Sequence, residues 1–297
     1  MKTKRSTKEK LIDEASVRLL DAIIRRAHRL PYQERIEWFA NKAEKVIAPL
    51  AGYRRRTLEN LEMVFPDRSH AEKREIASKS LRNFGRTLIE FYSPEDFKNH
   101  IRAGGASLEG DGVQELHNAC KSGRPVLMVA GHFGNYLASA CMVSDFGYPV
   151  AGLYRPFTNP LFDSKYRSTL LQHLSFVFPQ GKRGTFAFNK HLLGGGLCAI
   201  FSDVNEPEGE LINFLGVPAP TAVSAARLAL RTNALVLPFF DIRQEDGLSF
   251  RSVIEAPIAH DDPVSMTQAI TDRLEARVLE NPDQWFWVHR RWKRGSV

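Results

Sequence analysis

The feature of this sequence that most constrains the fold is the apolar run Val126–Ala130, which is followed by a glycine-containing turn around His132. An uninterrupted apolar run of this length, bounded by turn residues, predicts a strand that is fully buried. Residues 136–143 then predict the start of a helix. If the strand belongs to a parallel sheet, His132 lies at the carboxyl edge of that sheet, where open α/β folds bind their ligands.

Two further predicted strands end in polar residues that would reach the same edge. Residues 148–154 end at Arg155, and Leu197–Phe201 is followed by Asp203 and Glu206. An arginine at this position could meet an anionic or carbonyl-bearing ligand, or form a surface ion pair. Helical patterns alternate with the strands, so the sequence predicts an α/β fold with a mostly parallel central sheet flanked by helices.

The N-terminal part carries amphipathic helical patterns rich in basic residues. Apolar residues recur at intervals of three and four over residues 11–30 and 36–50, with Pro31 between the two runs. Two interpretations are open, a helical hairpin that covers the core or a helix that lies in the headgroup region of an anionic membrane. We therefore expect residues 1–52 to form an N-terminal amphipathic, membrane-associating segment, and residues 53–297 to form the α/β domain.

The composition is basic, with 41 Lys and Arg against 34 Asp and Glu and a net charge of +7. Such a charge favours anionic partners, which include nucleic acid, an acidic carrier protein and the anionic face of a membrane. The three cysteines lack paired metal-ligand spacing, so neither a metal nor a disulfide is expected to support the fold. No apolar stretch reaches the ~18 residues that a membrane-spanning helix needs.

Motifs exclude several catalytic classes. The sequence contains no Gly-x-Ser-x-Gly elbow and neither His-Glu-x-x-His nor Cys-x-x-Cys spacing. Residues 283–293 interleave aromatic and basic side chains, but a terminal segment packed on a core has the same composition, so nucleic-acid binding is not expected. The remaining chemistry is His132 as general base on a hydroxyl, with the oxyanion held by amides at a helix N-terminus and by Arg155. No cofactor is expected.

Five short fragments, spread over nearly the whole chain, form a specific pattern when they are taken together. They are Arg56-x-x-x-x-Asn60-Leu61 through Phe65-Pro66, Gly131-His132-Phe133-Gly134-Asn135, Tyr154-Arg155-Pro156, Asp203 with Phe214-x-Gly216 and Thr221, and Gln284-Trp285-x-Trp287-x-His289-Arg290-Arg291-Trp292-Lys293. In this order they resemble the bacterial lipid A biosynthesis acyltransferases of the late, lauroyl/myristoyl type, part of the wider glycerolipid acyltransferase superfamily.

The resemblance implies an acyltransferase-like domain over residues 53–297 and a peripheral enzyme on the cytoplasmic face of the inner membrane. Such an enzyme moves a fatty acyl group from acyl carrier protein or acyl-CoA to a hydroxyl of a lipid A precursor or related anionic lipid. It also implies that His132 is the base, and the predicted strand ends make Asp203 a second candidate catalytic residue. The candidate substrate-binding residues are Asn135, Arg155, Glu206, Arg56 and Arg290.

The sequence departs from the family pattern at one informative position. That pattern is a histidine, four residues, and then Asp or Glu, whereas Leu137 stands at the carboxylate position here. Leucine can neither orient an imidazole nor stabilise its charged form. Three explanations are open: Asp203 or Glu206 orients His132 instead; a backbone carbonyl orients it in a slower enzyme; or the chain is a non-catalytic relative that binds lipid or acyl carrier protein.

Overall fold

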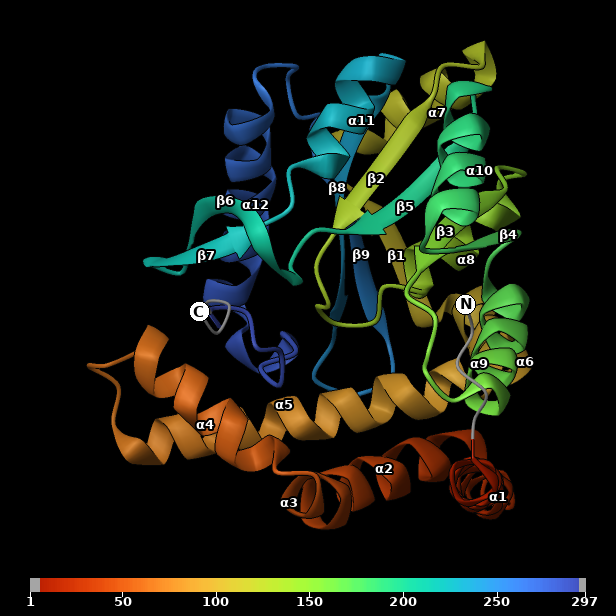
Figure 1. The fold of residues 1–297 in the computed structure, drawn as a ribbon, viewed down its shortest axis with the longest axis vertical. Coiled ribbons are helices and arrows are strands. Elements are labelled where there is room, and N and C mark those ends of the chain that lie inside the picture. The colour runs from red at the N-terminus through yellow and green to blue at the C-terminus, as the bar shows by residue number, and fades with distance from the viewer. Residues whose placement is uncertain (1–5, 294–297) are drawn as a thin grey trace.

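The computed structural model describes residues 6–293 and contains a seven-stranded sheet of order β1-β9-β8-β2-β5-β3-β4 (Figure 1). Its strands are Ala106–Glu109 (β1), Val126–Ala130 (β2), Val150–Tyr154 (β3), Phe176–Pro179 (β4), Leu197–Phe201 (β5), Leu235–Arg243 (β8) and Phe250–Ile254 (β9). The pairing of β8 with β9 is antiparallel and the other pairings in the sheet are parallel. The predicted fold class is confirmed.

Helices surround the sheet, and the long helix α5 crosses one side of it with α2 alongside (Figure 1). The helices are Thr7–Ala27 (α1), Tyr32–Lys42 (α2), Ala48–Leu50 (α3), Tyr53–Val64 (α4), His70–Phe91 (α5), Pro94–His100 (α6), Gly112–Ser122 (α7), Ala138–Asp145 (α8), Pro160–His173 (α9), Lys182–Leu193 (α10), Ser224–Thr232 (α11) and Pro263–Glu280 (α12). Turns of π-helix lie at Ala43–Ile47 and Ile101–Gly105, and a 3-10 turn lies at Pro282–Gln284. A two-stranded hairpin, Asn205–Phe214 (β6) and Val217–Thr221 (β7), stands beside the main sheet.

Both faces of β2 are covered, as its uninterrupted apolar sequence predicted. Leu127 and Val129 pack in one apolar cluster with residues of α10, α11 and α12. Met128 and Ala130 pack in another cluster with residues of α7 and α8. Because side chains alternate along a strand, a strand with helices on both faces must be apolar at every position.

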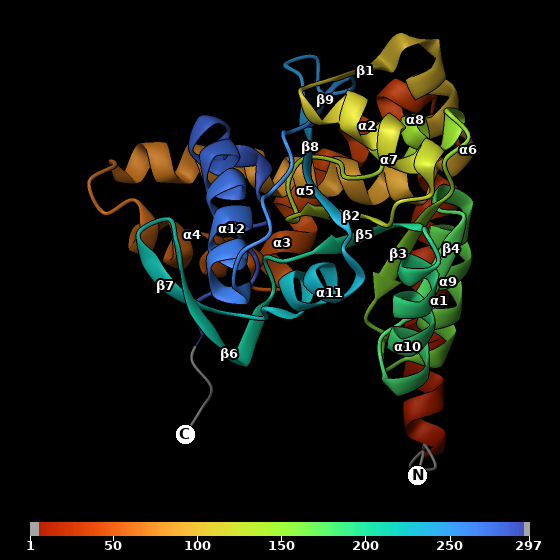
Figure 2. The same ribbon diagram turned by 90° about the horizontal axis from the view of Figure 1, so that it is seen from above.

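The N-terminal helices pack on the rest of the chain. Ile36 and Phe39 of α2 share a buried cluster with Ile89 of α5. α1 lies alongside α9 (Figure 2), held by the ion pair of Asp21 with Lys165 at 2.6 Å. Among residues 6–293, no helix combines the length and the apolar character needed to cross a membrane.

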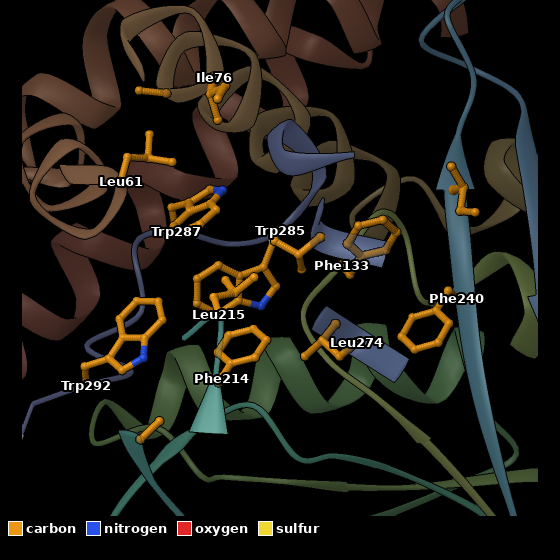
Figure 3. Close-up of a cluster of buried hydrophobic side chains, with 14 of the residues drawn as sticks. Leu61, Ile76, Phe133, Phe214, Leu215, Phe240, Leu274, Trp285, Trp287 and Trp292 are labelled. Carbon is orange, nitrogen blue, oxygen red and sulfur yellow. The ribbon is translucent and has the colours of Figure 1, made fainter. Parts of the chain in front are cut away.

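The C-terminal segment, defined as residues 282–293, contributes the largest side chains of one buried cluster (Figure 3). Trp285, Trp287 and Trp292 pack there with Leu61 of α4 and Phe214 of β6. The segment thereby joins α4, the β6–β7 hairpin and the strands β8 and β9 of the main sheet into one body.

Candidate active site

The strand register brings His132 and Asp203 together. β2 and β5 are parallel neighbours in which Ala130 is paired with Phe201. His132 lies two residues beyond Ala130, and Asp203 lies two residues beyond Phe201. The two chains therefore leave the sheet side by side, and their side chains meet at the carboxyl edge where open α/β folds place their sites.

Asp203 is buried and accepts three hydrogen bonds. Its Oδ1 lies 2.8 Å from His132 Nδ1, and its Oδ2 accepts from the backbone N–H of His132 at 2.7 Å and from Trp285 Nε1 at 2.9 Å. Burial by itself would raise the pKa of this carboxyl, but the charge and hydrogen bonds of His132 outweigh it and lower the pKa below its usual range. Asp203 is therefore an ionised carboxylate at neutral pH.

An ionised carboxylate can only accept hydrogen bonds, so the Nδ1 atom of His132 carries the proton that it shares with Asp203. In the neutral form of the ring, this tautomer leaves Nε2 unprotonated and able to accept a proton, and the ring becomes charged only when it does so. The His132 side chain is 27% exposed and borders two cavities. The site thus has the geometry of a general base with an orienting carboxylate.

Two glycines permit the sharp turn around His132. A Cβ atom on Gly131 would lie 2.5 Å from a methyl group of Leu274 and 3.0 Å from Asp203 Oδ2. Gly134 has a φ of 57° and approaches the carbonyl oxygen of Asp241 so closely that a Cβ would lie 1.7 Å from it. Any larger residue at either position would displace the turn that carries the imidazole.

A cavity of about 420 Å³ lies on one side of His132 and is called the large cavity. Its interior is apolar and its rim is polar. The apolar wall includes Met128, Leu137, Val150, Gly152, Leu170 and Leu174, and the polar groups include Arg155, Gln180, Ser202, Asn205 and Glu206. An apolar interior with a polar rim suits a ligand that has a hydrocarbon chain and a polar end.

A cavity of about 110 Å³, called the small cavity, lies between α5 and the C-terminal segment. His132, Tyr136 and Tyr166 border both cavities and so stand between them. Phe201 of the large cavity and Phe286 of the small cavity flank the imidazole, with ring centroids 4.6 and 6.5 Å from it. His132 is therefore reachable from two apolar spaces.

Asn135, a candidate substrate-binding residue, lies inside the protein. Its Nδ2 donates to Glu90 Oε2 at 2.6 Å, and its Oδ1 accepts from the N–H of Leu137 at 3.1 Å. Glu90 in turn forms a buried ion pair with Arg243. Asn135 borders neither cavity and instead ties the turn that carries His132 to α5 and β8.

The first amides of α8, expected to hold an oxyanion, are used inside the protein. The N–H groups of Leu137 and Ala138 donate to the side chain and the carbonyl oxygen of Asn135, and that of Ser139 donates to Asp241 Oδ2. These three amides are not free for a ligand, so the expectation was wrong for them.

Arg155 and Glu206 lie where the strand ends suggested. Arg155 follows β3 and Glu206 belongs to β6, and both are exposed at the rim of the large cavity. No hydrogen bond joins Glu206 to His132 within residues 6–293, because Asp203 occupies the Nδ1 side of the ring. Of the two carboxylates suggested as partners, the structure pairs Asp203 with the imidazole.

Arg56 and Arg290 lie outside both cavities. Arg56, on α4, donates from Nη1 to the carbonyl oxygen of Val288 at 3.3 Å and is half-buried. Arg290 is exposed on the C-terminal segment. The structure does not bring these two residues together with His132.

Leu137 is buried in the wall of the large cavity. It belongs to an apolar cluster with Phe91, Cys141 and Leu170. At this position the chain therefore extends the apolar surface of the cavity, while the carboxylate that meets His132 comes from the neighbouring strand.

Two residues of the site, Trp285 and His289, stand in the last family-like fragment of the sequence, but sequence reasoning gave neither of them a role in the site. Trp285 donates to Asp203, and the ring of His289 lies 4.6 Å from that of His132. Burial, and then the charge of His132, lower the pKa of His289 to about 3, so this ring stays neutral. Neither the alternation of aromatic and basic residues nor the family-like fragment indicates where the segment packs.

His132, Asp203 and His289 each offer one ligand atom within 4.8 Å of the others, a spacing that could hold a metal ion. However, both carboxylate oxygens of Asp203 already accept hydrogen bonds from N–H groups. A metal would have to displace at least one of these bonds. The donor set therefore fits a hydrogen-bonded histidine and aspartate better than a metal centre.

The known proteins to which this chain is similar are bacterial acyltransferases that act on lipids. Residues 3–294 match the family described as bacterial lipid A biosynthesis acyltransferase. The chain is 26% identical over 247 residues to the lipid A biosynthesis lauroyltransferase of Escherichia coli, covering 79% of this chain and 77% of that protein. It is 25% identical over 245 residues to a lipid A biosynthesis acyltransferase of Haemophilus influenzae, covering 79% and 75%. It is also 24% identical over 198 residues to the phosphatidylinositol mannoside acyltransferase of Mycolicibacterium smegmatis, covering 63% of each.

Proposed function

Since the chain belongs to the bacterial lipid A biosynthesis acyltransferase family, as its motifs predicted, we propose that it transfers a fatty acyl group to a hydroxyl of a lipid A precursor or related membrane lipid. The observation that supports a catalytic role is the hydrogen-bonded pair of His132 and Asp203, which lies beside the large cavity. The reaction is the O-acylation of an alcohol by a thioester and needs no cofactor.

In the proposed mechanism, His132 Nε2 takes the proton of the acceptor hydroxyl as the hydroxyl oxygen attacks the thioester carbonyl carbon. Asp203 stabilises the imidazolium that forms, and Arg155 at the cavity rim stabilises the developing oxyanion. The tetrahedral intermediate collapses with cleavage of the carbon–sulfur bond, and the imidazolium returns the proton to the thiolate. General base catalysis of this kind contributes about 10²–10⁴-fold.

The donor is acyl carrier protein or acyl-CoA, both of which are anionic. The net charge of +7 and the exposed arginines Arg55 and Arg290 favour such partners and an anionic acceptor. The hydrocarbon chain of the donor occupies the large cavity, whose wall includes Leu137, and Arg155 and Glu206 contact the polar end of the substrate. Residues of the apolar wall would then limit the length of chain that the enzyme accepts.

The proposed location is the cytoplasmic face of the inner membrane, and the surface that supports membrane binding is the outer side of α1. This helix is apolar on two sides. Ile24 and Ala27 are buried against the body of the protein, whereas Leu11, Ile12 and Leu19 are 62, 58 and 63% exposed. A helix that is apolar on its exposed side as well as its packed side is suited to the membrane interface.

Basic residues flank the exposed apolar side of α1. Arg18, Arg25 and Arg26 are exposed on the same helix, and each basic residue near an anionic bilayer surface adds roughly 1 kcal/mol of attraction. Asn159, at the start of α9, donates to the carbonyl oxygen of Asp13 on α1. α1 therefore lies beside the segment that follows Arg155, so membrane binding would hold the rim of the large cavity near the lipid.

Replacing Leu11, Ile12 and Leu19 together by serine is expected to weaken binding to phosphatidylglycerol vesicles by at least about tenfold, because apolar surface no longer enters the bilayer. Vesicle flotation measures the effect. The matched control replaces three residues that are also exposed but lie on other elements, namely Met63, Leu211 and Leu279. Equal flotation of the two triple variants would contradict the assignment of α1.

The function itself is tested by incubating the protein with a labelled acyl donor and a lipid acceptor. Separate arms use acyl carrier protein and acyl-CoA as donors, and a lipid A precursor and a phosphatidylinositol mannoside as acceptors. Label in the lipid product is the expected result. The alternative that Leu137 first suggested, a non-catalytic relative that binds lipid or acyl carrier protein, predicts binding without transfer in every arm.

A further inference from the structure

The C-terminal segment lies directly against the turn that carries His132. The N–H of Phe286 donates to the carbonyl oxygen of His132 at 2.9 Å, and the N–H of Gly134 donates to that of Gln284 at 2.9 Å. Phe133 and Trp285 form an antiparallel bridge between these bonds. The segment thus pairs with the turn as a short extra strand, and Trp285 lies beside Phe133, the residue that follows His132 (Figure 3).

The indole of Trp285 is fixed on all sides. Its ring centroid lies 4.8 Å from that of Trp287, 5.3 Å from that of Phe214 and 5.8 Å from that of Trp292, and the residue is buried. Aromatic side chains packed in this way have little freedom to move. The N–H of the indole is therefore held at one place, 2.9 Å from Asp203 Oδ2.

We propose that Trp285 is a positioning residue that fixes the Asp203 carboxylate for His132. Oδ2 accepts from the backbone N–H of His132 and from the indole N–H, which leaves Oδ1 directed at the imidazole Nδ1. Without the indole N–H, the carboxylate would keep one bond on Oδ2 and could rotate away from Nδ1.

Other charged or titratable groups also face this carboxylate. They are His132 on the turn after β2, Tyr136 next to that turn, and His289 and Arg291 of the C-terminal segment. Burial lowers the pKa of Arg291 to about 10, so its guanidinium stays charged at neutral pH. The indole N–H is distinct among the groups of the segment, because it bonds the carboxylate directly and does not titrate.

The proposal rests on the proposed acyl transfer, and Trp285→Phe tests it because phenylalanine keeps an aromatic ring but lacks the N–H. The turnover number is expected to fall on the order of tenfold, as for the loss of one hydrogen bond to a charged group, with KM within about twofold. The midpoint of the pH titration of the His132 ring, followed by NMR of labelled histidine, is expected to fall by roughly half a pH unit, because a carboxylate that has rotated away from Nδ1 stabilises the imidazolium less.

Trp287→Phe is the matched control. Trp287 is equally buried in the same cluster, but its Nε1 donates to the carbonyl oxygen of Pro282 and not to the site. This variant is expected to keep the wild-type midpoint for His132. The same turnover and the same midpoint in both variants would overturn the role of Trp285.

The NMR titration needs no turnover, so it tests the positioning role of Trp285 separately from the proposed acyl transfer. Absence of transfer by the wild-type protein would refute the proposed function, while a midpoint shifted only in Trp285→Phe would still support the positioning role. If Trp285→Phe does not fold, benzothienylalanine at this position gives the same comparison, because it keeps the bicyclic shape and replaces the N–H by sulfur.

Discussion

Asp203→Asn is expected to lower the turnover number for acyl transfer by about 10³–10⁴-fold. Asparagine has nearly the same shape but carries no charge, so it cannot stabilise an imidazolium, and its amide can present N–H to the ring and favour the wrong tautomer. The corresponding replacement in a serine protease triad costs about 10⁴-fold. Steady-state rates with the labelled donor and lipid acceptor measure the effect.

The control for that variant is Asp241→Asn on the adjacent strand β8. Asp241 is also buried, its Oδ2 accepts from Ser139, and it has no bond to His132. Burial raises the pKa of Asp241 to about 6, so a neutral side chain at this position removes little favourable interaction. We expect turnover within about threefold of wild type. Equal losses in the two variants would show that Asp203 acts only through the fold.

Leu137→Glu is expected to damage the enzyme even though it restores the family pattern. The new carboxylate would lie in a buried apolar cluster with no partner, which costs about 3 kcal/mol of unfolding free energy. It would also place charge in the wall of the large cavity and lower the rate of transfer. Denaturant unfolding and steady-state kinetics measure the two effects.

Leu137→Met is the matched control, because it conserves volume and apolar character and is expected to cost less than about 1.5 kcal/mol. The decisive combination is Leu137→Glu with Asp203→Asn. If residue 137 is part of the cavity wall, the double variant is no more active than Asp203→Asn alone. Recovery of activity in the double variant would instead show that a carboxylate at residue 137 can orient His132 in place of Asp203.

The sheet and the position of His132 were accessible from the sequence because they depend on local pattern. Val126–Ala130 is apolar at every position, which is typical of a strand covered on both faces, and the strand was found with the predicted bounds. The sequence predicted that His132 and Asp203 are neighbours only on the condition that the strands that precede them are parallel. The register of Ala130 with Phe201 is what makes them neighbours, and register between distant strands is set by tertiary packing.

Other parts of the site could not be predicted because they depend on contacts between distant segments. Asn135 stands in the motif that resembles the family, but its amide bonds Glu90, 45 residues away. Trp285 follows Asp203 by 82 residues, and nothing in its local sequence indicates that its N–H reaches that carboxylate. Aromatic and basic residues at a chain end are compatible with many packing partners, so the pattern predicts burial and not position.

The N-terminal helices show the same difference between what local pattern predicts and what depends on contacts between distant segments. The sequence left open whether its amphipathic helices cover the core or bind a membrane. Ile36 and Phe39 of α2 pack on α5, whereas Leu11 and Leu19 of α1 remain exposed. Periodicity identified both helices, but only the packing shows which apolar sides are already covered.

The central claim is that His132, oriented by Asp203, is the base in acyl transfer. The most direct measurement is the rate of transfer of labelled acyl group to the lipid acceptor by wild type and His132→Gln at equal concentrations of folded protein. We expect transfer by the wild type and a loss of at least about 10⁴-fold in the variant, with donor binding retained. Transfer at the same rate by both proteins would contradict the claim.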